Sequence, residues 1–439
     1  MNMSAIKSAL LGVALFAGAS VAFAQNEQFI PVLSYRTGPY AAGGSGYYGG
    51  AIDYFTLVNM SGGINGVKLK WEECETEYNA SKGVECYERL KKKNGGASTV
   101  EPLSTGIAYG LFDRVAQDKI PMTTFGYGLA SSADGRIYPW VFPIGTTYWD
   151  QMAAMIAYLG QKEGGLDKLK GKKIAFLYHD SAYGKEPIPV LDALASKLGF
   201  EAMKIPVTPP GQTMESQWLQ IRQAKPDYVI VWTYGVMSTV ALKTAAKTGY
   251  PKNKLLGVWW AGSEEDVIPA GDAAKGYVSA SFTGSGLGYP IVQDIKTKVY
   301  GAGKGNLEDP TRLGNVMWTR GLVYGMIVVE ALRVAQNQFG KGKVMTPEQL
   351  RWGFENLDLT DARIKEIGAP GLFPAIKTSC MDHEGSGMVK FQEWTGSGFK
   401  QVTPFMTGDR DMVRKMVEET AGKYATEKKI TPRDCSKEG

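Results

Sequence analysis

The chain has 439 residues, of which 44% are hydrophobic and 21% charged, and its formal net charge is +5. This composition excludes a disordered or collagen-like chain, and the length predicts two or three domains. So small a positive excess gives no reason to expect a nucleic-acid partner. The only two histidines, His179 and His383, are far apart, so we expect no zinc or iron centre and no other cofactor.

The first two dozen residues have the pattern of a cleavable export signal. Lys7 supplies a positive charge, residues 9–19 form an apolar run, and Ala22 and Ala24 are the small residues that precede a cleavage site. The apolar run is short for a membrane anchor, which is the alternative. The sequence therefore predicts a signal peptide over residues 1–24 and a soluble periplasmic chain.

Export to an oxidising compartment favours disulfides among the four cysteines. Cys74 follows a strand-like run and Cys86 lies in a helix-like run, so these two form the favoured local pair. A second pair, Cys380 with Cys435, would clamp the C-terminal tail. Buried free thiols remain the alternative.

Strand-like and helix-like runs alternate along the chain. Strands are predicted over residues 29–35, 67–72, 98–103 and 121–125, and helices over 49–60, 81–93 and 106–117. After a helix at 148–161 the pattern restarts, with strands over 173–178, 201–207, 228–232 and 255–260 and helices over 188–198, 216–224 and 238–248. A long helix at 311–338 and a strand at 388–394 follow. This alternation predicts an α/β fold of two Rossmann-like lobes with parallel central sheets.

Parallel sheets bind ligands beyond the carboxyl ends of their strands. Ser104 and Thr105 follow a predicted strand directly before a helix, where hydroxyl and free amide groups can hold a carboxylate or phosphate. A plain helix cap without a ligand is the alternative. Gly126, Tyr127 and Gly128 follow the next strand, where small residues let a ligand approach the backbone.

In the second half of the chain, aromatic residues follow three successive strands. These residues are Tyr183, Tyr234, Trp259 and Trp260, and the acidic Glu264 and Glu265 come shortly afterwards. Together the aromatic rings predict a wall for an apolar or aromatic ligand, although each alone is more often a packing residue.

Two sequence features that are typical of enzymes do not predict an enzyme here. Residues 44–49 match the G-x-G-x-x-G dinucleotide pattern, but eight residues separate them from the preceding strand, whereas a true fingerprint follows its strand immediately. Neither histidine stands in a recognisable nucleophile context, so we predict no enzyme activity.

Taken in order, these runs resemble type I periplasmic substrate-binding proteins, and more narrowly the branched-chain (hydrophobic) amino acid family that serves ABC importers. The likeness is carried by residues 36–69, 103–106, 173–184, 226–234, 270–277, 382–385 and 391–394. It implies a monomer with two lobes joined by a three-strand hinge, closing around a small carboxylate ligand, with an ABC permease and ATPase as partners. We expect lobe I over residues 25–145 and 284–378, lobe II over 146–283 and 379–405, and a C-terminal tail over 406–439.

The resemblance also implies roles for single residues. The loop at Ser104 and Thr105 would hold the ligand carboxylate, the backbone around Gly126 and Gly128 would contact the carboxylate and the amine, and Tyr183 and Tyr234 would close over the ligand. Trp259 stands where the family places the acid that pairs with an α-ammonium group, and Glu264 or Glu265 is the substitute nearby. Gly128 likewise replaces a hydroxyl residue.

Two ligand classes therefore stay open. One is a branched-chain amino acid. The other is an aromatic carboxylate without an amine, walled by the rings of Tyr127, Tyr183, Tyr234, Trp259 and Trp260. An exported enzyme on the same scaffold and the ligand-sensing subunit of a receptor are the alternative functions.

Overall fold

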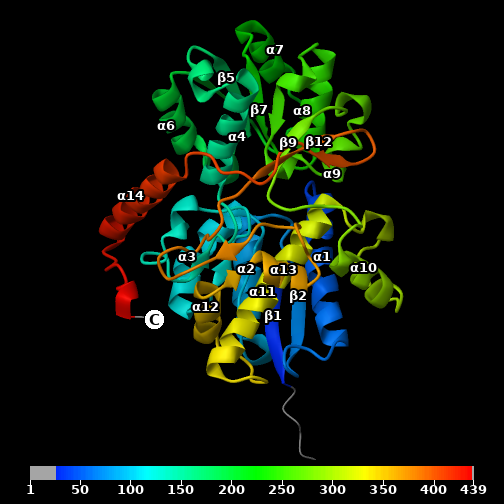
Figure 1. The fold of residues 1–439 in the computed structure, drawn as a ribbon, viewed down its shortest axis with the longest axis vertical. Helices are drawn as coiled ribbons and strands as arrows, with labels where there is room; N and C mark the ends of the chain where they lie inside the picture. Colours follow the sequence, from blue (N-terminus) through cyan, green and yellow to red (C-terminus); the bar gives the residue numbers. More distant parts are fainter. Residues whose placement is uncertain (1–25, 438–439) are drawn as a thin grey trace, which may run out of the picture.

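The computed structural model describes residues 26–437, so the predicted signal peptide lies outside the described residues. The chain folds into two α/β lobes stacked along the long axis of the molecule (Figure 1). Within residues 26–437, no helix is long and apolar enough to span a membrane. In the same range, no three acidic, histidine or cysteine side chains are grouped so as to hold a metal ion.

The lower lobe, lobe I, is built on parallel strand pairs. Strand β1 (Glu27–Ser34) pairs with β2 (Lys68–Glu75), and β3 (Met122–Thr123) pairs with β4 (Val141–Phe142). The predicted strand at 98–103 is reduced to single bridges, Val32 with Glu101 and Val100 with Met122, which join these two pairs. Its helices are α1 (Ala41–Met60), α2 (Ala80–Leu90), α3 (Thr105–Asp118), α11 (Val316–Phe339), α12 (Pro347–Glu355) and α13 (Asp361–Glu366).

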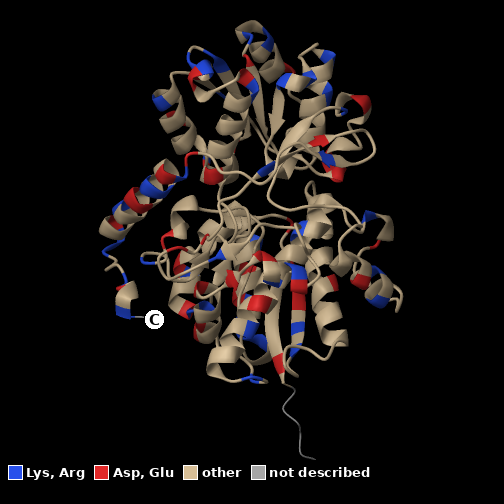
Figure 2. Cartoon of the chain, in the orientation of Figure 1, with Lys and Arg blue, Asp and Glu red and all other residues tan. Residues whose placement is uncertain are grey.

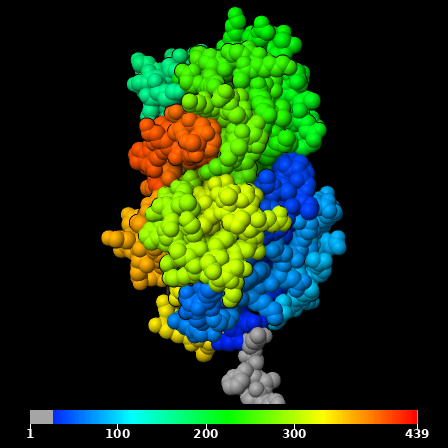
Figure 3. Space-filling model, turned by 90° about the vertical axis from the view of Figure 1, so that its right-hand side faces the viewer, coloured from blue at the N-terminus to red at the C-terminus, as the bar shows by residue number. Residues whose placement is uncertain are grey.

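The upper lobe, lobe II, contains a seven-stranded sheet in the order β13-β12-β9-β8-β7-β5-β6. The parallel strands are β5 (Lys173–His179), β6 (Glu201–Val207), β7 (Tyr228–Trp232), β8 (Leu255–Gly257) and β9 (Val278–Ser281). The predicted parallel central sheet is confirmed, and strands β12 (Lys390–Trp394) and β13 (Phe399–Gln401) join its edge antiparallel. Figure 3 shows this late segment, in orange, packed on the upper lobe.

The main helices of lobe II flank this sheet. They are α4 (Tyr148–Glu163), α5 (Ala182–Lys185), α6 (Ile188–Leu198), α7 (Glu215–Ala224), α8 (Val236–Lys247) and α9 (Glu264–Val267). Because β8 ends at Gly257, Trp259 and Trp260 lie in a 3-10 turn (Trp259–Ala261) after the strand. The predicted strand at 255–260 is therefore too long.

The chain passes between the two sheets three times: after β4, after β9 and before β12. The first and third passages are held together by backbone hydrogen bonds from Gly145 N to Glu384 O and from Gly387 N to Gly145 O, both of 2.8 Å. Helix α10 (Pro290–Asp294) and the short strands β10 (Asp358–Leu359) and β11 (Ile376–Lys377) complete lobe I.

The predicted C-terminal tail forms helix α14 (Arg410–Lys428), which alternates basic and acidic residues along its length (Figure 2). It packs against α4 of lobe II and against residues 130–133 of lobe I, and so crosses between the lobes. The structure contains the disulfides Cys74–Cys86 and Cys380–Cys435, and the second ties the end of the tail to the loop that follows β11.

Glycines allow α1 and α11 to pack with their backbones in contact. Helix α1 begins at Ala41, eight residues before the predicted start, so the run over residues 44–49 lies inside a helix and forms no phosphate-binding turn. A Cβ atom at Gly50 would lie 1.9 Å from Trp318 O, and one at Gly321 would lie 1.7 Å from Tyr47 O. Within the dinucleotide-like pattern, Gly44 packs against Tyr35 after β1 and Gly46 against Met317 of α11, so these glycines serve packing.

Candidate ligand-binding site

A small cavity lies between the two lobes where the carboxyl ends of their strands meet. Lobe I contributes one side of it and lobe II the other. Its lining residues are Tyr35, Tyr78, Leu103, Ser104, Thr105, Tyr127, Tyr148, Tyr183, Tyr234 and Trp260. Its volume of about 10 Å³ is the room of about one water molecule. A larger ligand therefore requires the lobes or the lining side chains to move apart.

The polar end of the cavity is the start of α3. Ser104 is the N-cap residue, and its Oγ accepts a 3.4 Å hydrogen bond from Ile107 N. Thr105 follows it, and its buried Oγ1 has no hydrogen-bond partner among the described residues. The first backbone amides of α3 lie at this same end of the cavity, and so does the positive end of the helix dipole. These groups are all donors suited to a carboxylate, and a buried hydroxyl without a partner costs free energy until one is supplied.

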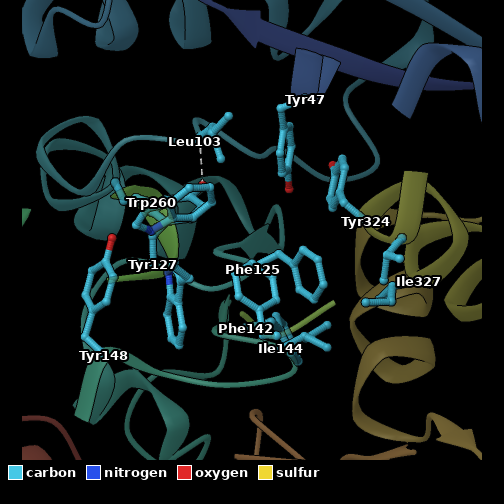
Figure 4. Packing of buried hydrophobic residues seen from close by; sticks show 14 of the residues in the cluster. Tyr47, Leu103, Phe125, Tyr127, Phe142, Ile144, Tyr148, Trp260, Tyr324 and Ile327 are labelled. Carbon is cyan, nitrogen blue, oxygen red and sulfur yellow. Dashed lines mark hydrogen bonds between the residues drawn. The ribbon is translucent and has the colours of Figure 1, made fainter. Parts of the chain in front are cut away.

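Tyrosine rings form most of the walls, as the close view of Tyr127, Tyr148 and Trp260 illustrates (Figure 4). The Tyr127 hydroxyl accepts a 2.8 Å hydrogen bond from Leu103 N, and the Tyr183 hydroxyl donates to Thr233 O at 3.0 Å. Burial raises the pKa of Tyr78 and of Tyr148. Both hydroxyls therefore stay protonated at neutral pH and can donate to an anion.

The two tryptophans join the lobes through one carbonyl group. Trp259 Nε1 and Trp260 Nε1 both donate to Gly126 O, at 2.9 and 3.2 Å. This carbonyl oxygen thus uses both of its lone pairs on indole groups. Gly126 and Gly128 do not line the cavity, and of the two tryptophans only Trp260 does.

The predicted acidic substitutes lie outside the cavity. Glu264 accepts a 2.9 Å hydrogen bond from Val316 N at the start of α11, and burial raises its pKa to about 7. Glu265 forms an ion pair of 2.5 Å with Arg312. The cavity therefore has no acidic side chain among the described residues that line it.

Sequence reasoning missed four lining residues: Tyr35, Tyr78, Leu103 and Tyr148. The first two follow β1 and β2, so the strand-end rule that selected Ser104 would have found them. Leu103 was included in a predicted strand. Tyr148 begins α4 and follows no strand directly, so only the fold brings it to the cavity.

A buried carboxyl group beside the cavity makes the stability of the protein depend on pH. Glu186 accepts a 2.9 Å hydrogen bond from Ala130 N of lobe I, its other oxygen has no partner, and burial raises its pKa to about 8. Since the folded state binds this proton more strongly than the unfolded state, stability falls as the pH rises from about 4.5 to about 8. We expect Glu186→Gln to remove this fall.

The free energy of unfolding should be measured by urea denaturation between pH 4 and 9. Relative to the wild type, the free energy of unfolding of Glu186→Gln should rise by on the order of 4 kcal/mol between pH 4 and pH 9. Glu308→Gln, at an exposed position, is the matched control and should run parallel to the wild type. Parallel curves for Glu186→Gln as well would contradict this assignment.

Comparison with known proteins identifies the family. The model of the periplasmic binding protein family matches residues 27–399. A structure from the Pseudomonas fluorescens group, described as an ABC transporter permease, is 44% identical with a TM-score of 0.88, and the match covers 94% of this chain and 100% of that one. A comparison with curated protein sequences gave no match.

More distant structures share the fold. A branched chain amino acid ABC transporter protein from Thermus thermophilus with bound valine has 22% identity and a TM-score of 0.76, over 89% of this chain and 99% of that one. An ABC transporter solute binding protein from R. palustris in complex with benzoate has 18% identity and a TM-score of 0.69, over 87% and 98%. The resemblance found in the sequence is confirmed: the chain belongs to the type I periplasmic binding protein family, which is extracytoplasmic, and it is a substrate-binding protein rather than an enzyme.

Proposed function

We propose that the protein captures a small aromatic carboxylate without an α-amine in the periplasm and delivers it, as a monomer, to an ABC permease and its ATPase. The observation that carries this proposal is the chemistry of the cavity. Hydroxyl and amide donors gather at the start of α3, aromatic rings form the walls, and no acidic side chain faces inward among the described residues.

The α-ammonium group of an amino acid would find no charged partner in such a cavity. Glu264 and Glu265 are engaged by Val316 and Arg312 outside it, and Gly126 O already accepts two indole N–H groups. Burying an unpaired cation costs several kcal/mol, whereas a carboxylate meets only donors here. Among proteins of this fold, one holds valine and another benzoate, so the fold accommodates both classes of ligand.

A matched pair of ligands tests the proposal. 3-Phenylpropanoate and phenylalanine share one skeleton and differ by the α-amine. By isothermal titration calorimetry, 3-phenylpropanoate should bind about 100-fold more tightly than phenylalanine, since the unpaired ammonium costs at least about 3 kcal/mol. The alcohol 3-phenylpropanol should not bind, because it lacks the anion. Equal or tighter binding of phenylalanine or valine would contradict the proposal.

A further inference from the structure

A second, larger pocket adjoins the cavity between the lobes. It has a volume of about 430 Å³ and is lined from lobe I by residues 39–43 and from lobe II by the start of α8 and the turn around α9. Its walls include the apolar side chains of Pro39, Val236, Val240 and Pro269. Two acidic residues also line it, but Glu265 is paired with Arg312, and Asp266 accepts hydrogen bonds from Ser263. Of all the lining residues, only Tyr234 faces both this outer pocket and the inner cavity.

Tyr234 forms a partition between the two pockets, and its buried ring contacts Tyr40 and Tyr78 of lobe I and Trp260 of lobe II. Its hydroxyl forms a 2.7 Å hydrogen bond with that of Tyr35, and its ring stacks on Tyr40 at 5.2 Å, with only 4° between the ring planes. Gly43 leaves the room for this ring position, because a Cβ atom there would lie 2.7 Å from the Tyr234 hydroxyl oxygen. Both the hydrogen bond and the stack join lobe I to lobe II, so they break when the lobes separate.

The inner cavity alone is too small for an aromatic acid. The outer pocket, on the other side of Tyr234, is large enough for one. We propose that Tyr234 swings aside and that the outer pocket is the second half of the binding site. In this arrangement the carboxylate lies at the start of α3, and an apolar extension of the acid passes Tyr234 into the outer pocket. The inference rests on the proposed function and narrows the ligand to extended aromatic carboxylates.

The test compares benzoate with 4-butylbenzoate by isothermal titration calorimetry. In the wild type, 4-butylbenzoate should bind at least about ten-fold more tightly, because its chain buries apolar surface. Val236→Trp fills the outer pocket from an exposed position, 37% accessible in the structure. It should weaken binding of 4-butylbenzoate about ten-fold and leave that of benzoate within about two-fold. Val344→Trp, at an exposed valine of lobe I outside both pockets, is the control and should change neither.

A second variant tests the partition itself. Tyr234→Ala should weaken benzoate binding about ten-fold, because benzoate loses a wall, and should leave 4-butylbenzoate within about three-fold, because its chain fills the merged space. Circular dichroism establishes that both variants are folded.

The outcomes separate the two proposals. If benzoate binds but the butyl chain adds nothing, or if Val236→Trp weakens both acids equally or neither, the outer pocket is not part of the site and the inference alone is overturned. If Tyr234→Ala weakens both acids equally, Tyr234 is a fixed wall, which also overturns it. If neither acid binds the wild type while valine does, the proposed function fails and the inference falls with it.

Discussion

The double variant Ser104→Ala, Thr105→Ala should lose at least about 100-fold in affinity for benzoate, because hydrogen bonds to a charged group contribute about 1.5–3 kcal/mol each. Ser104 Oγ and the unpartnered Thr105 Oγ1 are the two hydroxyl groups at the start of α3. Isothermal titration calorimetry measures the loss. Thr105→Ser keeps a hydroxyl group at the same position and should retain affinity within about three-fold.

Removal of an N-cap also weakens the helix that it caps, by about 1 kcal/mol. Thr360→Ala removes the N-cap of α13, which accepts from Arg363 N away from the cavity, and so provides a matched control for stability. It should lower stability by a similar amount and leave benzoate binding unchanged. If the double variant still bound benzoate as the wild type does, the carboxylate would lie elsewhere.

Gly321→Ala should destabilise the protein by about 3 kcal/mol or more, because the new methyl group forces two packed helices apart. In the structure a Cβ atom at this position would lie 1.7 Å from Tyr47 O of α1. A backbone atom cannot rotate away as a side chain can. The free energy of unfolding from urea denaturation measures the effect.

The matched control for this substitution is Gly422→Ala on α14. Gly422 is exposed, and a Cβ atom there meets nothing within 4 Å. Alanine is the better helix former, so this variant should gain about 0.5–1 kcal/mol. A Gly321→Ala protein as stable as the wild type would mean that α1 and α11 tolerate a wider separation than the structure shows.

Local patterns in the sequence predict most of the elements, because each strand and helix of an α/β lobe buries a face with its own periodicity. They also place Ser104 and Thr105 at the start of α3, since the strand-to-helix turn is a local feature. The dinucleotide interpretation of residues 44–49 was set aside from the sequence, but the start of α1 at Ala41 was missed, because this glycine-rich segment is helical through its packing on α11, more than 260 residues away in the chain. Short elements such as β8 were predicted too long for the same reason: tertiary contacts end them.

The walls of the cavity were harder to predict than its polar end. Tyr35 and Tyr78 obey the strand-end rule, but Tyr148 reaches the cavity only through the arrangement of the two lobes. Trp259 and Gly126 were expected at the ligand and instead hydrogen-bond to each other across the lobes. Such contacts depend on how the sheets of the two lobes are placed relative to each other. A local sequence pattern does not predict that placement.

A crystal structure of the protein with benzoate tests the central claim most directly. We expect benzoate to be enclosed between the lobes, with carboxylate oxygens about 2.6–3.2 Å from the hydroxyl groups of Ser104 and Thr105 or the first amides of α3. Its ring should lie against the tyrosines and Trp260. Benzoate bound to one lobe alone, or with its carboxylate turned away from α3, would contradict the account.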